Sequence, residues 1–282
     1  MLRQRIITAL VLVFIMLGAL TADSLWPFAL LVLALIAAAG WEWGQLNQAS
    51  TGLSWAMGLA VAAAGGLALA AGWGQHAPAA LWWVAAVLWV GLGAVALRTG
   101  PAAWPQLPRV ARWGVGLVAL WFTWLAVAQA RAVGINFMLS VFCLVWMADV
   151  AAYFGGKTWG RRKLAPSISP GKSWEGVWSG MVGVLLLSAL WIWIDGAFKV
   201  DGPSVYSRFW LAFGPVGMAA ALLALSGLSV VGDLVESLVK RAAGAKDSSR
   251  LLPGHGGVLD RVDALMPVVP AAMALMTLVG TK

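Results

Sequence analysis

Long apolar runs separated by short polar stretches dominate this chain of 282 residues. Nine segments approach the length of about 20 mostly apolar residues that an α-helix needs to cross a bilayer. They cover residues 6–22, 25–44, 54–73, 79–97, 113–133, 136–155, 175–195, 208–226 and 264–280. A helix with a polar face continues the eighth segment over residues 226–241. The pattern predicts an all-α, polytopic integral membrane protein with about nine transmembrane helices.

Composition supports the membrane prediction, because 61% of the residues are hydrophobic and only 11% are charged. A soluble domain of this length needs many more charges to cover its surface. The net charge of +8 raises the question of which side of the membrane carries the positive residues. The chain contains no RNA- or DNA-binding motif, so we expect no nucleic-acid partner.

The lysines and arginines orient the predicted helices. If the N-terminus is cytoplasmic, 15 of the 19 lysines and arginines fall in cytoplasmic segments and 4 on the opposite side. This asymmetry is the one that the positive-inside rule expects. It predicts a cytoplasmic N-terminus, and it places the two most polar blocks of the chain on the cytoplasmic side, where nucleoside triphosphates are found.

The scarce acidic residues are concentrated near the C-terminal end. Five of the 11 lie within positions 233–263: Asp233, Glu236, Asp247, Asp260 and Asp263. Asp233 and Glu236 are three positions apart, as are Asp260 and Asp263, so each pair shares a helix face. Two such pairs brought together would form an oxygen cage for a hard cation such as Mg²⁺. The alternative is that each acid forms a salt bridge with a neighbouring lysine or arginine.

A glycine-rich loop, Leu252–Gly257, lies between the two carboxylate pairs. Glycine permits positive φ and a close approach of backbone N–H groups to an anion, so this loop could cradle phosphate oxygens. Lys240, Lys246 and Arg261 add positive charge nearby. His255 in the loop could donate to a phosphate or serve as a hydrogen-bonded structural histidine.

A second polar block, residues 155–173, is rich in basic and small residues. It could be a topology signal that binds anionic headgroups, or a site for a substrate phosphate to which Lys172 and Ser173 contribute. Asp149, late in the sixth predicted span, is a functional candidate with Lys172 or a metal as its partner, because carboxylates inside a membrane segment are costly.

These two blocks resemble a known enzyme family. The stretch SLVKRAAGAKDSSRLLPGHGGVLDRVD, residues 237–263, is similar to the signature of the phosphatidate cytidylyltransferases, also called CDP-diacylglycerol synthases. The stretch DVAAYFGGKTWGRRKLAPSISPGKSWEG, residues 149–176, resembles the second stretch typical of that family. The family usually has Asp-Thr where this chain has Asp149-Val150, so position 150 has no hydroxyl. The resemblance covers roughly the C-terminal half of the chain.

The resemblance implies a membrane nucleotidyltransferase of phospholipid biosynthesis that converts CTP and phosphatidate to CDP-diacylglycerol and pyrophosphate. It implies residence in the bacterial cytoplasmic (inner) membrane with the active site facing the cytoplasm, and dependence on one or two Mg²⁺ ions. It divides the chain into N-terminal transmembrane helices, residues 1–135, and a C-terminal catalytic region, residues 136–282. A homodimer remains open.

The site residues expected from the blocks and the resemblance fall into three sets. The catalytic residues are Asp233, Lys240, Asp260 and Asp263. The substrate-binding residues are Lys172, Ser173, Ser237, Arg241, Lys246, Asp247, His255, Gly256, Gly257 and Arg261. The metal ligands are Asp233, Glu236, Asp260 and Asp263.

Three other functions are compatible with parts of the pattern. A CTP-dependent lipid-alcohol kinase has similar chemistry but transfers one phosphoryl group. A CDP-alcohol phosphotransferase would carry a D-G-x-x-A-R start, which this chain lacks. A transporter would place polar residues in broken helices at the middle of the membrane, whereas most acids here cluster at one face.

Overall fold

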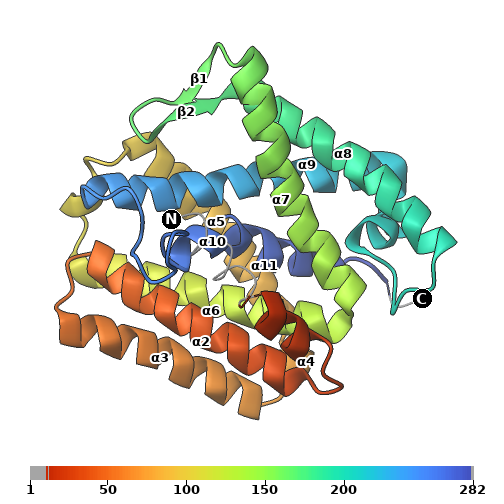
Figure 1. Ribbon diagram of the computed structural model, residues 1–282, viewed down its shortest axis with the longest axis horizontal. Coiled ribbons are helices and arrows are strands. Elements are labelled where there is room, and N and C mark those ends of the chain that lie inside the picture. The colour runs from red at the N-terminus through yellow and green to blue at the C-terminus, as the bar shows by residue number, and fades with distance from the viewer. Residues whose placement is uncertain (1–10, 12, 281–282) are drawn as a thin grey trace.

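The computed structural model describes residue 11 and residues 13–280, and the chain is almost entirely helical in this range (Figure 1). Seven helices are long and apolar enough to cross a membrane. They are α2 (Leu25–Leu46), α3 (Thr51–Ala70), α5 (Ala79–Thr99), α6 (Arg109–Val133), α7 (Ile135–Trp159), α8 (Trp174–Ala197) and α9 (Val205–Ala242). The protein is therefore an all-α, polytopic membrane protein, as the hydrophobic pattern predicts.

The remaining elements are short. They are α4 (Trp73–His76), the 3-10 helix η1 (Trp104–Gln106), α10 (Leu259–Val262), α11 (Leu265–Met276) and the strands β1 (Lys163–Ala165) and β2 (Ser169–Ser173). The two strands form an antiparallel hairpin in which Lys163 pairs with Ser173 and Ala165 pairs with Ser169. This hairpin lies within the second polar block of the sequence and connects α7 to α8.

The predicted spans and the observed helices differ at three places. The first predicted span, residues 6–22, lies partly outside the described residues, and its described part is helical over residues 13–20. The last, residues 264–280, is represented by α11, which has only 12 residues. The eighth span and the polar-faced helix that follows it are one helix, α9, of 38 residues, with a kink where Gly214 has a φ of 67° and Pro215 follows. The count of nine spans therefore stays a prediction.

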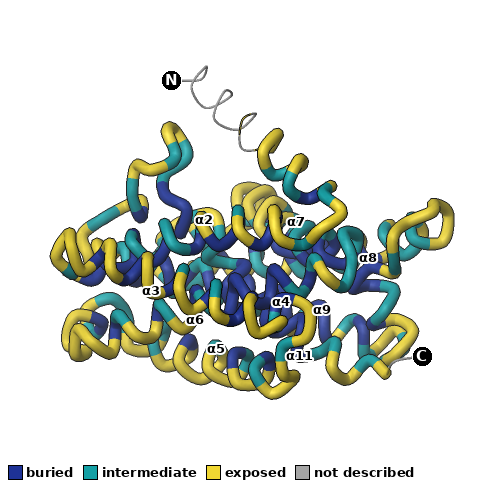
Figure 2. Tube along the Cα trace, turned by 90° about the horizontal axis from the view of Figure 1, so that it is seen from below, coloured by how far each residue is buried: buried dark blue, intermediate teal, exposed yellow. Residues whose placement is uncertain are grey.

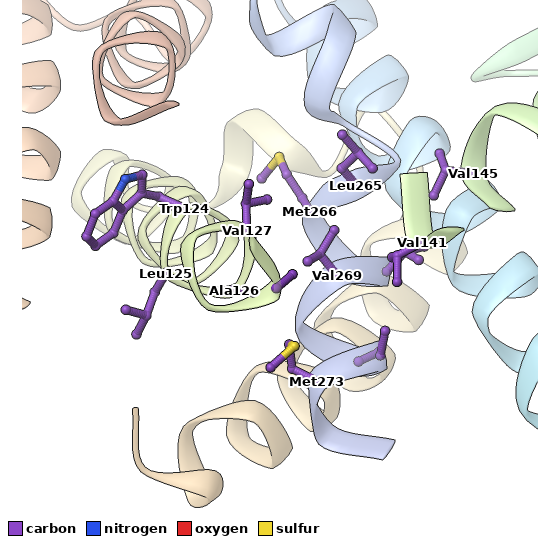
Figure 3. Close-up of a cluster of buried hydrophobic side chains, with 14 of the residues drawn as sticks. Trp124, Leu125, Ala126, Val127, Val141, Val145, Leu265, Met266, Val269 and Met273 are labelled. Carbon is purple, nitrogen blue, oxygen red and sulfur yellow. The ribbon is translucent and has the colours of Figure 1, made fainter. Parts of the chain in front are cut away.

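Helix α11 forms the centre of the core. Its residues from Leu265 to Ala274 are all buried, as expected for a helix that is apolar on every side. Figure 3 shows Met266, Val269 and Met273 of α11 beside the α6 residues Ala126 and Val127 and near α7. Figure 2 shows the buried positions gathered in the middle of the molecule, with exposed positions toward the outside. Asp263 directly precedes this tightly packed helix.

Close packing of α7 against α8 depends on small residues. A Cβ atom at Gly176 would lie 2.8 Å from the carbonyl oxygen of Ala152, and one at Gly180 would lie 2.6 Å from that of Ala148. Glycine at these positions lets the two backbones approach, as is common between membrane helices. The result brings Asp149 on α7 close to the hairpin that precedes α8.

The hairpin is held at both of its ends. The carboxylate of Glu175 accepts hydrogen bonds from the backbone N–H of Arg161 at 3.0 Å and from Nε of Arg162 at 3.0 Å. At the turn, the side chain of Ile168 is buried and its carbonyl oxygen accepts a hydrogen bond of 3.3 Å from Nε of Arg241 on α9. These contacts fix β2, and with it Lys172, beside α9.

Candidate active site

A cavity of about 550 Å³, here called the polar cavity, lies between α7, β2, α8, α9 and the segment that joins α10 to α11. All of its lining residues lie between Val145 and Leu265, within the predicted catalytic region. Its charged lining residues are Asp149, Lys157, Lys172, Asp233, Asp260, Arg261 and Asp263. Acidic and basic groups therefore meet in one open cavity, formed by segments far apart in the sequence.

Asp233 on α9 connects the two polar blocks of the sequence. The ammonium of Lys172 on β2 donates a hydrogen bond to Oδ2 of Asp233 and forms an ion pair with it. The hydroxyl of Ser237 donates to Oδ1 of Asp233 at 3.3 Å. Ser173 lines the same cavity, and its hydroxyl accepts the N–H of Gly176 at 3.2 Å, which caps α8. Lys172, Ser173, Asp233 and Ser237, all predicted site residues, are thus brought together.

Lys240 joins two carboxylates. Its ammonium lies 2.5 Å from Oε2 of Glu236 and 2.6 Å from Oδ1 of Asp260; Glu236 is buried, and the other two side chains are partly buried. Oδ2 of Asp260 accepts three more hydrogen bonds, at 2.8–2.9 Å, from the N–H and hydroxyl of Ser248 and from the N–H of Gly257. Burial alone would raise the pKa of Asp260, but Lys240 and these donors hold its pKa well below the usual range.

Glu236 is not among the residues that line the polar cavity, although Lys240 links its carboxylate to Asp260, and its assignment as a metal ligand stays a prediction. It lines a separate, apolar cavity of about 320 Å³, together with Trp43, Phe122 and other apolar residues of α2, α5, α6 and α11. Residues three apart on an α-helix are offset by about 60° around its axis, which is enough to direct Asp233 and Glu236 into different spaces here. Both carboxylates of the second pair, Asp260 and Asp263, do line the polar cavity.

The carboxylates of the polar cavity are of the right chemical type for a hard cation. Burial raises the pKa of Asp263, and the negative charge of Asp233 raises it further. Two acids that repel each other across a cavity are a favourable place for a divalent cation with oxygen ligands. Within the described residues, however, no group of three or more His, Cys, Asp or Glu side chains is arranged to hold a metal ion. The donor set fits Mg²⁺ in type, and Lys172 and Lys240 currently balance part of its charge.

Several predicted substrate-binding residues lie outside the wall of the polar cavity: Arg241, Lys246, Asp247, His255, Gly256 and Gly257. Arg241 holds the hairpin through the carbonyl oxygen of Ile168. The carbonyl oxygen of His255 accepts a hydrogen bond of 3.1 Å from Nε of Arg261, which does line the cavity. Arg241 and His255 thus support the wall, and the assignment of the whole set as substrate contacts stays a prediction.

Two N–H groups of the glycine-rich loop have acceptors within the protein, and the assignment of this loop as a phosphate cradle stays a prediction. The N–H of His255 donates to the carbonyl oxygen of Leu252 at 2.8 Å, and that of Gly257 donates to Asp260 at 2.8 Å. Gly256 has a φ of 82°, and a Cβ atom there would lie 2.8 Å from Oδ2 of Asp260. The glycines therefore allow the loop to fold closely around the carboxylate of Asp260.

One residue of the N-terminal region was not identified from the sequence. Glu42 is the only acidic residue of α2, its side chain is fully buried, and it accepts hydrogen bonds from the segment 248–259. The sequence feature that could have revealed Glu42 is a single carboxylate within an apolar run. Burying a charged group in a membrane segment is energetically costly, so such a residue usually has a role. The two family motifs recognised in the sequence lie in the C-terminal half and did not direct attention to it.

The fold and the polar cavity define a class of protein: an integral membrane protein that gathers carboxylates and basic side chains around one cavity. Comparison with known proteins identifies the family. The profile described as the cytidylyltransferase family matches residues 3–279, and the chain belongs to this family. The match spans every residue that lines the polar cavity.

Curated relatives carry one name. A phosphatidate cytidylyltransferase of Pseudomonas aeruginosa is 38% identical over 288 residues, which covers 99% of this chain and 98% of the relative. Enzymes of the same name from Haemophilus influenzae and Brucella melitensis are 46% and 44% identical, over 49% and 52% of this chain and 44% and 47% of their own lengths. The likeness to the first relative therefore extends over both halves of the chain.

Proposed function

We propose that this protein is a phosphatidate cytidylyltransferase, which transfers a cytidylyl group from CTP to phosphatidate in the membrane. The observation that carries this proposal is the likeness to the Pseudomonas aeruginosa enzyme over 99% of the chain. A phosphate oxygen of phosphatidate attacks the α-phosphorus of CTP. The bond between the α-phosphorus and the bridging oxygen to the β-phosphorus breaks, CDP-diacylglycerol forms and pyrophosphate leaves.

The polar cavity suits this reaction because both reactants are anions that must approach each other. Lys157, Lys172 and Arg261 line the cavity and place positive charge around the phosphates. The lipid phosphate is already an anion near neutral pH, so the attacking oxygen requires no strong general base. The chain's main contribution is to neutralise charge and to orient the two phosphates.

Asp233, Asp260 and Asp263 are the predicted carboxylates that line the cavity and would hold one or two Mg²⁺ ions, with Asp149 nearby. The metal supplies charge neutralisation at the triphosphate. Lys240 keeps Asp260 ionised and fixed in place, and Lys172 orients Asp233. Glu236, which lines the apolar cavity, is joined to this set through Lys240, and its role as a further metal ligand stays a prediction.

The proposal includes a bacterial cytoplasmic (inner) membrane location, nine spans, a cytoplasmic N-terminus and an active site that faces the cytoplasm. The seven described spanning helices, the unequal division of lysines and arginines and the bacterial source of the relatives support it. A homodimer remains a prediction.

The test compares two lipids that differ only in their phosphate. Purified protein is incubated with CTP, Mg²⁺ and vesicles that contain either phosphatidate or diacylglycerol, and both pyrophosphate and lipid products are measured. We expect equal amounts of pyrophosphate and CDP-lipid with phosphatidate, and no turnover with diacylglycerol. Phosphorylation of diacylglycerol without pyrophosphate release would identify a lipid-alcohol kinase and overturn the proposal.

A further inference from the structure

Glu42 is the buried carboxylate that connects the N-terminal region to the signature segment. It lies on α2, and its side chain has no exposed surface. Its four hydrogen-bond donors all belong to the segment 248–259, which is more than 200 positions away in the sequence. No lysine or arginine of the described residues forms an ion pair with it. Hydrogen bonds alone therefore stabilise this carboxylate.

The arrangement of the donors requires two acceptor oxygens. Oε1 of Glu42 accepts the hydroxyl of Ser249 at 2.5 Å and the N–H of Val258 at 2.9 Å. Oε2 accepts the hydroxyl of Ser248 at 3.3 Å and the N–H of Leu259 at 2.7 Å. A backbone N–H can only donate, and one of them faces each oxygen. An amide in place of the carboxylate would direct its NH₂ group at one of these N–H groups, whichever way it is turned.

The same segment carries a wall of the polar cavity. The hydroxyl of Ser248 lies 3.3 Å from Glu42 and 2.8 Å from Asp260 and can donate its single proton to either, while its N–H donates to Asp260, so the two carboxylates flank the segment. Gly257 lies between them, and a Cβ atom there would come within 2.5 Å of Oε1 of Glu42 and even closer to the hydroxyl of Ser248. Asp260 in turn accepts a hydrogen bond from the ammonium of Lys240. The position of Asp260 in the cavity thus depends on the hydrogen bonds that Glu42 accepts from the same segment.

We infer that Glu42 is a positioning residue for the transferase reaction, which acts by fixing the segment 248–259 so that Asp260 and Arg261 reach the polar cavity. It touches neither the cavity nor a substrate, since it is absent from the cavity wall. Its effect on turnover rests on the proposed function, whereas its effect on the segment does not.

The test uses Glu42→Gln in the purified full-length protein, with Asn47→Ala as the matched control. Asn47 is also fully buried, and it lies at the end of α2 that the charge distribution predicts to be cytoplasmic. Its side chain accepts a hydrogen bond from Trp104 and donates one to the carbonyl oxygen of Trp43, but it forms none with the segment 248–259. Two quantities are measured: hydrogen exchange of the amides of Val258 and Leu259, and the kcat and KM values for CTP and phosphatidate.

For Glu42→Gln we expect the two amides to exchange about tenfold faster or more, because a buried donor loses its acceptor, and kcat to fall by about tenfold or more. For Asn47→Ala we expect unchanged exchange at these amides and a wild-type kcat, even if the protein melts at a lower temperature. If the amides of Glu42→Gln exchange as in the wild type, or if kcat is unchanged although they exchange faster, the inference is wrong.

A milder variant covers the case in which Glu42→Gln does not fold. Ser249→Ala removes one donor to Glu42, so it should change exchange and kcat in the same direction by about threefold. No change in either quantity would overturn the inference. A wild-type protein that forms no CDP-lipid would refute the proposed function instead, and the exchange result would still decide whether Glu42 fixes the segment.

Discussion

Asp233→Asn is the substitution that best separates a metal ligand from a salt-bridge partner. Asp233 lines the polar cavity, with a side chain that is 28% exposed and bonds only to Lys172 and Ser237 among the described residues. Asparagine preserves the size of the side chain and one acceptor oxygen. It removes the negative charge that a hard cation requires.

The expected effects on activity and stability differ in size. Metal charge stabilisation contributes several kcal/mol to a transition state, so we expect kcat to fall by about 10²-fold, which corresponds to about 2.7 kcal/mol. An ion pair with both side chains partly exposed, as Lys172 and Asp233 are, contributes about 0–1 kcal/mol to folding. The yield of folded protein should therefore change little.

Initial rates of CDP-lipid formation are measured across a Mg²⁺ titration, beside thermal unfolding of the same preparation. Asp195→Asn is the control: Asp195 lies outside the polar cavity and accepts hydrogen bonds from Asn136 at 2.8 Å and from Ser207 at 2.6 Å. It should lose stability and keep its kcat. If Asp233→Asn loses folded yield while the surviving molecules keep full kcat and the wild-type response to Mg²⁺, Asp233 is a salt-bridge partner and the metal hypothesis is refuted.

Three further predictions concern other parts of the molecule. Replacing Lys172 by Met should raise the KM for CTP or phosphatidate or lower kcat. If the kinetics are unchanged, the positive charge of the hairpin is a topology signal and not a substrate contact. Gly257→Ala should reduce activity and stability by crowding Glu42, whereas Gly52→Ala, where nothing lies within 4 Å, should be tolerated. A cysteine at position 282, in a variant without the native cysteine, should react with an impermeant reagent from outside the cell. Labelling of that position only from the cytoplasm would contradict the predicted topology.

The fold class follows from the hydrophobic pattern because bilayer length and backbone hydrogen bonding restrict a chain with such long apolar runs to spanning helices. The same pattern does not decide whether α11 spans the membrane. Residues 264–280 are as apolar as a span, but the helix ends at Met276 after 12 residues and is buried within the protein. Hydropathy alone cannot tell a lipid-facing helix from a core helix, because both are apolar.

The sequence predicted the site residues that lie close together in one local motif. It did not predict which way a side chain points where the packing of helices decides this. Asp260 and Asp263 were expected together and line one cavity, whereas Asp233 and Glu236 share a spacing but face different cavities. The contact between Lys172 and Asp233 joins two distant blocks. Glu42 escaped prediction because its partners are brought near only by the tertiary fold.

The most direct measurement of the central claim follows the phosphorus atoms of CTP. Purified protein, phosphatidate vesicles and Mg²⁺ are incubated with CTP labelled at the α-phosphorus in one reaction and at the γ-phosphorus in a parallel reaction, and lipid and aqueous fractions are counted. Cytidylyl transfer predicts that the α label enters the lipid fraction and that the γ label leaves as pyrophosphate. Entry of the γ label into lipid, or of neither label, would contradict the account.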